Sequence, residues 1–277
     1  MRRHSSAALI CALLAGCSGG SDGTPAVAAR AAPSEPAGAQ RRYRTKFPHT
    51  QDPISQGGRW VNGGTVGLDW TNVRTTPGLA FGTMPGDAGY PQQYADSTAV
   101  LEGAWGADQT VRATLRVPDP SGESGVYEEV ELRVRTTILP HSITGYEINC
   151  SVNTSDPYMQ VVKWNGPLAN FTQLDGRSVG CADGDVLEAT VTGGSAAVIT
   201  VYKNGKLMFA VTDANNPFAS GSVGIGFFLQ GATGLNAGYG FSRFYGEAED
   251  ARAALGSKPV TRTGIARMAL NVRSSSH

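Results

Sequence analysis

Short runs in which apolar and polar residues alternate recur along this chain, and they constrain its fold more than any other feature. In YEEVELRVRTT, residues 127–137, Val130, Leu132 and Val134 fall on one side and the charged residues on the other, because successive side chains of a strand leave opposite faces. The same period recurs in residues 145–153, whereas helical periodicity is nearly absent. Many short strands bounded by Gly, Asn, Asp and Pro predict an all-β sandwich or barrel.

The N-terminus carries the marks of an export signal. Arg2 and Arg3 precede an apolar run that ends in LAGC at residues 14–17, and this run is too short to remain as a membrane-spanning helix. The LAGC stretch resembles the lipobox of bacterial lipoproteins. The resemblance implies cleavage before Cys17, acylation of Cys17 and, with Ser18 next to it, an outer-membrane location in the cell envelope. An ordinary signal peptide with an incidental cysteine is the alternative.

Composition divides the rest of the chain into three parts. Residues 17–42 are rich in Ala, Gly, Ser and Pro, which predicts a flexible tether after the signal peptide of residues 1–16. Residues 43–248 hold the alternating runs and have a length suited to one all-β domain. Residues 249–277 form a C-terminal tail. Lys and Arg together balance Asp and Glu at 23 each, and there is no basic stripe, so we expect no nucleic-acid partner and membrane contact only through the lipid anchor on Cys17.

Two cysteines remain in the predicted domain, Cys150 and Cys181. An even pair in an oxidising compartment predicts a disulfide. It would close a loop of about thirty residues and stabilise the fold by roughly 3–4 kcal/mol on the chain-entropy model. Few histidines accompany this pair, so we expect no metal site made from it. The oxygens of TDANNP, residues 212–217, are compatible with calcium, although turn chemistry explains the same residues. No other cofactor is expected.

The order of three C-terminal segments resembles a known fold family. VYKNGKL contains Asn204-Gly205, a favoured two-residue hairpin turn, and it is followed by GSVGIGFFLQG and GFSRFYGEA. This order resembles the closing strands of concanavalin A-like jelly rolls of the laminin-G-like kind, over about residues 55–247. The resemblance implies a two-sheet antiparallel jelly-roll sandwich with carbohydrate bound across the concave sheet. Lectins, glycoside hydrolases, polysaccharide lyases and adhesion modules share this fold, so activity stays open.

A glycoside hydrolase would use Glu129 and Glu131. Two residues apart on one strand face, their Cα atoms lie about 6.6–6.8 Å apart. That spacing is compatible with the separation of about 5–5.5 Å between the carboxyls of retaining enzymes, or about 6.5–9.5 Å in inverting ones. Hydrolases of this fold, which this strand resembles in part, carry a Glu-x-Asp-x-x-Glu pattern on one strand. Arg133 and Arg135 stand where further acids would be expected, and an adjacent arginine lowers the pKa of a carboxyl, which hinders a general acid.

A polysaccharide lyase is a second catalytic alternative. Alginate-type lyases carry three motifs, Arg-x-Glu-Leu-Arg, Gln-Ile-His and Tyr-Phe-Lys. This chain resembles them in part, with VELR at 130–133, QVV at 160–162 and VYK at 201–203. The resemblance implies that Arg133 and Gln160 would neutralise a uronate and Tyr158 would act as base. The leading arginine of the first motif and the histidine of the second are missing.

Sugar binding without chemistry is the function we expect from the residue types. Planar groups that form paired hydrogen bonds, and aromatic rings that stack on a pyranose, would come from one sheet face. The candidate ligand-binding residues are Glu131, Arg133, Arg135, Asn149, Tyr158, Gln160 and Trp164. We expect the charged residues of 127–137 on the exposed face of this sheet. A structural or adhesion module, with cross-strand ion pairs and a core Trp164, is the alternative.

Overall fold

The computed structural model describes residues 40–84 and 95–249, all within one compact unit. The expected signal peptide, lipidated Cys17 and most of the tether lie outside the described residues, as does the tail from residue 250. The first strand begins at Arg41, two residues inside the expected tether. Within the described ranges, no helix has the length and apolar character needed to cross a bilayer.

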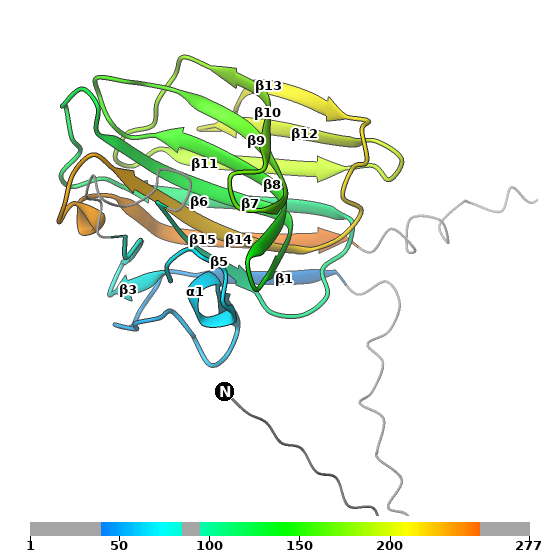
Figure 1. Cartoon of the computed structure of the whole chain (residues 1–277), viewed down its shortest axis with the longest axis horizontal. Helices are drawn as coiled ribbons and strands as arrows, with labels where there is room; N and C mark the ends of the chain where they lie inside the picture. Colours follow the sequence, from blue (N-terminus) through cyan, green and yellow to red (C-terminus); the bar gives the residue numbers. More distant parts are fainter. Residues whose placement is uncertain (1–39, 85–94, 250–277) are drawn as a thin grey trace, which may run out of the picture. The chain divides into compact units, whose positions relative to one another are not determined.

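In the described ranges, fifteen strands form two antiparallel sheets (Figure 1). Sheet A has the order β13-β12-β11-β6-β15-β4-β3, with β1 also paired to β15, and sheet B has the order β10-β9-β8-β7-β14-β5-β2. The elements are β1 (Arg41–Thr45), β2 (Trp60–Asn62), α1 (Gly63–Val66), β3 (Arg74–Thr76), β4 (Leu79–Phe81), β5 (Asp96–Leu101), β6 (Asp108–Arg116), β7 (Tyr127–Leu139), β8 (Ser142–Ser151), β9 (Met159–Pro167), β10 (Phe171–Arg177), β11 (Val186–Thr192), β12 (Ala197–Lys203), β13 (Lys206–Asp213), β14 (Ser222–Gln230), η2 (Asn236–Gly238) and β15 (Gly240–Glu249). The prediction of an all-β, two-sheet antiparallel sandwich of the jelly-roll kind is confirmed.

The main hydrophobic core fills the space between the two sheets. Val130, Leu132 and Val134 of β7 are fully buried in it, together with Ala113 and Leu115 of β6. The three residues of β7 are those that the period-two pattern placed on one face, because each strand buries every second side chain. Every residue of this core lies between residues 47 and 248, so the domain carries its own hydrophobic core.

The expected disulfide joins Cys150 of β8 to Cys181 in the loop before β11, with an S–S distance of 2.04 Å. Both residues are buried in the main core. The predicted hairpin is also present, since Asn204 and Gly205 connect β12 to β13 with φ values of 54° and 74°. Positive φ at both central residues is the requirement of a type I′ turn. Both local predictions are therefore confirmed.

A second, smaller hydrophobic cluster lies on the outer face of sheet B. Leu68 and Trp70, from the segment that follows α1, pack on Val162 and Trp164 of β9. Trp70 and Trp164 meet edge to face, with ring centroids 4.8 Å apart. This segment covers one end of the outer face. No other described segment covers the remainder of that face, which forms the groove described below.

Candidate ligand-binding groove

Strand β7 presents three charged side chains, Glu129, Glu131 and Arg133, to the outer face of sheet B. They alternate with the core residues of the same strand, as the sequence pattern predicted. Glu131 lies opposite Asn149 of β8 and Gly226 of β14. Both Glu131 and Arg133 have an exposed fraction of 0%. The expectation that they stand on an exposed face is therefore wrong, since neighbouring side chains and the segment after α1 cover them.

Arg133 is the centre of a buried ionic network. Its Nη1 donates to Glu147 Oε2 at 2.7 Å, and its Nη2 donates to Glu131 Oε2 and lies 3.7 Å from Asp96 Oδ1. Its guanidinium carbon lies 5.0 Å from the ring centroid of Trp70. Buried charge is tolerated only when it is paired and hydrogen-bonded. Three carboxyls from three strands and one aromatic ring supply those partners.

Glycine makes the room that this network occupies. A Cβ atom added at Gly226 would lie 2.1 Å from Glu131 Oε2 and 2.9 Å from Arg133 Nη2. Gly226 is paired with Glu131 in the register of β14 and β7. The Gly-Ile-Gly run of β14 therefore has no side chains on this face at Gly224 and Gly226, and the side chains of β5, β7 and β8 meet above it.

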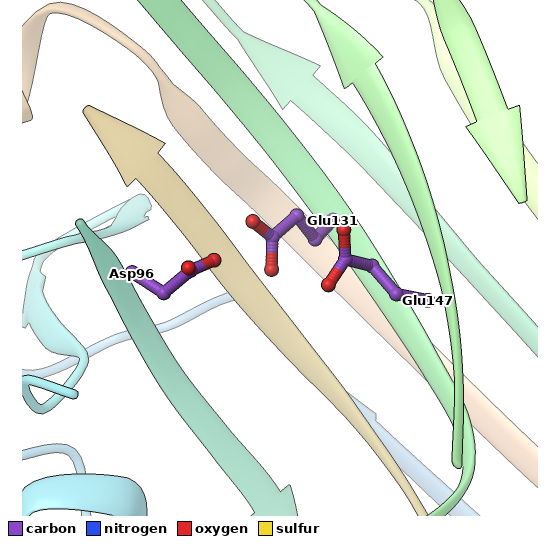
Figure 2. A group of neighbouring side chains, drawn as sticks. All are labelled: Asp96, Glu131 and Glu147. Atoms are coloured by element: carbon purple, nitrogen blue, oxygen red, sulfur yellow. The ribbon is translucent and has the colours of Figure 1, made fainter. Parts of the chain in front are cut away.

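The carboxyls of Asp96, Glu131 and Glu147 point toward one another across β14 (Figure 2). Burial and then the charge of Glu147 raise the pKa of Asp96 from 3.8 to about 7, against the lowering effect of Arg133. Burial also raises the pKa of Glu131 well above its usual value. The hydrogen bond between these two carboxyls lowers the pKa of Asp96 and raises that of Glu131.

This carboxyl cluster has the oxygen donors that a hard cation prefers, since one oxygen from each of the three residues lies within 4.8 Å of the others. The guanidinium of Arg133 already contacts two of the three carboxyls through charge-assisted hydrogen bonds. Arg133 thus takes the place that a bound cation would otherwise have.

Beside the buried network, the outer face of sheet B is hollowed into a groove of about 680 Å³. Its walls and floor combine aromatic rings, amides and carboxyls. The lining residues are Asp96, Tyr127, Glu129, Glu147, Asn149, Asp156, Pro157, Tyr158, Gln160, Val162, Trp164, Ala169, Phe171, Ser178, Phe228 and Gln230. This lining includes four carboxylic acids and no Lys, Arg or His among the described residues. The groove is therefore acidic.

Glu129 and Tyr158 form a pair inside the groove. The hydroxyl of Tyr158 donates a hydrogen bond to Glu129 Oε1. Burial and then the charge of Glu147 raise the pKa of Glu129 to about 8, and the hydrogen bond from Tyr158 opposes this rise. Burial and the neighbouring carboxyl of Glu129 also raise the pKa of Tyr158 far above its usual value. At neutral pH both side chains therefore hold their protons.

Four of the sequence-predicted ligand residues line the groove: Asn149, Tyr158, Gln160 and Trp164. Trp164 is only 6% exposed. Its Nε1 donates to Glu147 Oε2 at 2.6 Å and its ring lies 5.2 Å from that of Phe171, measured between centroids. Phe171 is 51% exposed, so it offers the more accessible ring. Glu131 and Arg133 lie beneath this surface rather than on it.

Arg135 is not part of this face, and the expectation that it would be is wrong. The pairing of β7 with β8 shifts between Val134 and Thr137, and Arg135 has φ 47°. A bulge of this kind ends the regular alternation. The guanidinium of Arg135 donates to the backbone oxygens of Ala107, Gly193 and Phe218. Arg135 therefore ties three loops together as a structural residue.

The oxygens of residues 212–217 are also engaged within the protein. Lys163 Nζ lies 2.7 Å from Asp213 Oδ2 and donates to the backbone oxygens of Asn215 and Asn216. The hydroxyl of Tyr146 donates to the same carboxylate at 2.8 Å. The ammonium of Lys163 thus stands where calcium was considered, and the loop is explained without an ion.

Several contributors to the site were missed by sequence reasoning, among them the exposed ring of Phe171. Glu147 shares one strand face with Asn149 in residues 145–153, so its face was predictable although its partner was not. Asp96 begins a strand whose residues are all buried, and no periodicity marks it. Trp70 reaches Arg133 from the segment after α1, a contact between distant parts of the sequence that no local pattern signals.

The sequence matches no known family model and no curated protein. Among solved structures, the carbohydrate-binding module CBM66 from Bacillus subtilis has 14% identity and a TM-score of 0.43, covering 65% of this chain and 96% of that module. An endo-1,3-beta-glucanase from Streptomyces sioyaensis has 12% identity and a TM-score of 0.47, covering 78% of this chain and 99% of the glucanase. The carbohydrate recognition domain of Emp47p has 13% identity and a TM-score of 0.42, covering 74% of this chain and 94% of that domain.

Proposed function

We propose that the groove on sheet B binds a polysaccharide or glycoconjugate. The observation that carries this proposal is the combination, in one open groove, of the exposed ring of Phe171 with the amides of Asn149 and Gln160. An aromatic ring stacks on the apolar face of a sugar, while amides and carboxyls form hydrogen bonds with its hydroxyls. The covering segment packs on Trp164 at one side of the groove, and no other described segment covers it.

The charge of the groove limits the class of glycan that it can bind. Asp156 faces the groove at an exposed position, with no Lys, Arg or His among the described lining residues, and Arg133 is fully buried below it. Like charges that face each other across an interface disfavour binding. We therefore expect neutral glycans to bind and uronate-rich glycans to be rejected. The residues that the lyase alternative requires are not in place, since Arg133 cannot reach a uronate and the raised pKa of Tyr158 makes it a poor base.

Binding is tested with the domain of residues 40–249, which contains the whole described core. Calorimetry would compare a neutral β-glucan with alginate, using the wild type and the double variant Phe171→Ala with Gln160→Ala. We expect binding of the glucan only, and its loss in the double variant. Leu207→Ala with Lys206→Ala is a matched control, because both residues are exposed on a hairpin of sheet A. If the folded wild type binds no neutral glycan, the proposal is wrong and a structural or adhesion module becomes the better interpretation.

A hydrolase remains the second candidate, because one observation favours it. Glu129 faces the groove with a pKa of about 8, and a carboxylic acid that stays protonated at neutral pH is what a general acid requires. Incubation with the same glycans would reveal new reducing ends. Their appearance with the wild type, and their absence with Glu129→Gln, would establish hydrolysis. Binding without reducing ends would leave the groove as a recognition site.

Anchoring of the chain is a separate proposal. We infer from the LAGC sequence that Cys17 is acylated and that the domain is held at a membrane of the cell envelope. Metabolic labelling with a palmitate analogue tests this, with Cys17→Ser as the control. A label that persists in the variant would refute it.

A further inference from the structure

The outer face of sheet A, opposite to the groove, has the reverse charge. Arg44 of β1 lies beside Tyr245 of β15, which in turn lies beside Arg112 of β6. Arg112 is 5.5 Å from the Tyr245 ring, measured from its guanidinium carbon to the ring centroid. Arg243 is two residues before Tyr245 on the same strand, so it shares this face. Three neighbouring strands therefore bring cations together.

These cations border a hollow of about 630 Å³. Lys46, which follows β1, joins Arg44, Arg112 and Arg243 in its lining, and no acidic residue of the described ranges lines it. All four side chains are exposed. Arg112 lies 3.6 Å from Glu188. No salt bridge reaches Arg44, Lys46 or Arg243 from the described part of the chain. Arg44 also borders an adjoining hollow lined by Arg42, His49 and Arg59, so the basic surface continues beyond β15.

We propose that this basic face of sheet A is a docking surface for an anionic phospholipid membrane. Its cations are spread over neighbouring strands of one sheet face, which suits a plane of phosphate groups better than one small anion. Juxtamembrane cations contribute about 1 kcal/mol each near an anionic bilayer, or about fivefold in partitioning. Two acids share this face, Glu188 beside Arg112 and Glu247 beside Arg42, and the overall balance of charge in the sequence does not reveal the surface.

The position of β1 favours a lipid surface over a soluble polyanion. β1 supplies Arg44 and is the first described strand after the proposed anchor at Cys17. At most about 3.6 Å per residue separates the two ends of an extended chain, so residues 18–40 allow this face to reach the membrane that holds the anchor. Docking through sheet A would turn the groove of sheet B away from the bilayer, toward soluble or wall-bound ligands.

The test uses the domain of residues 40–249, which lacks the proposed anchor, in co-sedimentation with vesicles. Vesicles of phosphatidylcholine containing about one third phosphatidylglycerol would be compared with pure phosphatidylcholine. The triple variant Arg44→Gln, Arg112→Gln, Arg243→Gln should bind the anionic vesicles roughly a hundredfold more weakly, at about fivefold per cation. Added salt should weaken wild-type binding, because exposed charges are screened.

The matched control removes the same charge elsewhere, through Arg74→Gln, Arg177→Gln and Lys206→Gln, three exposed cations on other strands. Equal loss of binding in control and test variants would overturn the proposal, as would wild-type binding that does not depend on phosphatidylglycerol. Tight binding to soluble heparin with no vesicle binding would also overturn it, in favour of a soluble polyanion. Circular dichroism would confirm that each variant is folded.

Discussion

Replacement of Glu129 by glutamine should make the protein more stable at alkaline pH. The pKa of Glu129 rises from 4.5 to about 8 on folding, chiefly through burial. The folded state therefore binds the proton more tightly than the unfolded state does. Stability is fully present below about pH 4.5 and is lost as the pH rises through about 8. Glutamine resembles the protonated carboxyl, remains uncharged and still accepts the hydrogen bond of Tyr158.

The magnitude follows from the pKa difference. One pKa unit corresponds to about 1.4 kcal/mol, so the full effect of Glu129 is at most about 5 kcal/mol. Glu129 is partly exposed to solvent in the groove, and screening reduces the effect, so we expect about 2 kcal/mol. The free energy of unfolding of Glu129→Gln should equal that of the wild type at about pH 4.5 and exceed it by this amount at about pH 9.5.

Urea unfolding followed by tryptophan fluorescence measures this difference, provided that the dependence on urea is the same in both proteins. Glu123→Gln, at an exposed site, is the control, and its stability relative to the wild type should not change between these two pH values. A Glu129→Gln protein that is destabilised equally at both pH values would refute the reasoning. That result would mean that the Glu129 carboxyl is ionised in the folded protein at neutral pH.

Arg133→Met should lower the free energy of unfolding by about 3–5 kcal/mol, because three buried carboxyls lose their counter-charge; an unchanged melting temperature by calorimetry would contradict this. Cys150→Ala with Cys181→Ala should cost about 3–4 kcal/mol, since the disulfide spans 31 residues. Urea unfolding checks it, and a loss below about 1 kcal/mol would count against the chain-entropy account. Lys163→Met should cost about 2–4 kcal/mol by leaving a buried carboxylate unpaired. Lys206→Met, at an exposed position, should stay within about 0.5 kcal/mol by thermal unfolding.

Local patterns predicted much of this fold. Alternation in residues 127–137 and 145–153 identified β7 and β8 and assigned Val130 and Leu132 to the core. The Asn204-Gly205 turn and the Cys150–Cys181 disulfide were also predicted correctly. Each of these depends on neighbours in sequence or on a simple pairing rule. Such features can be inferred without knowing how the sheets pack.

The chemistry of the candidate site was less predictable. Period two assigns Glu131 and Arg133 to one face, but it does not show what covers that face. The cover includes Trp70, from a segment far away in sequence. Arg135 was misassigned because the alternation was extended through a bulge. The groove itself depends on where the covering segment ends, which is a property of tertiary packing.

Gly226 restricts which substitutions β14 and the ionic network can accept during evolution. Any larger residue there would meet the carboxylate of Glu131 and the guanidinium of Arg133. A lineage that replaces this glycine must therefore also replace the charged residues, and one that keeps the charges must keep the glycine. We expect these three positions to covary among relatives. A chain with Gly, Glu and Arg at the corresponding places would then be recognisable as a true relative even where the remaining sequence has diverged.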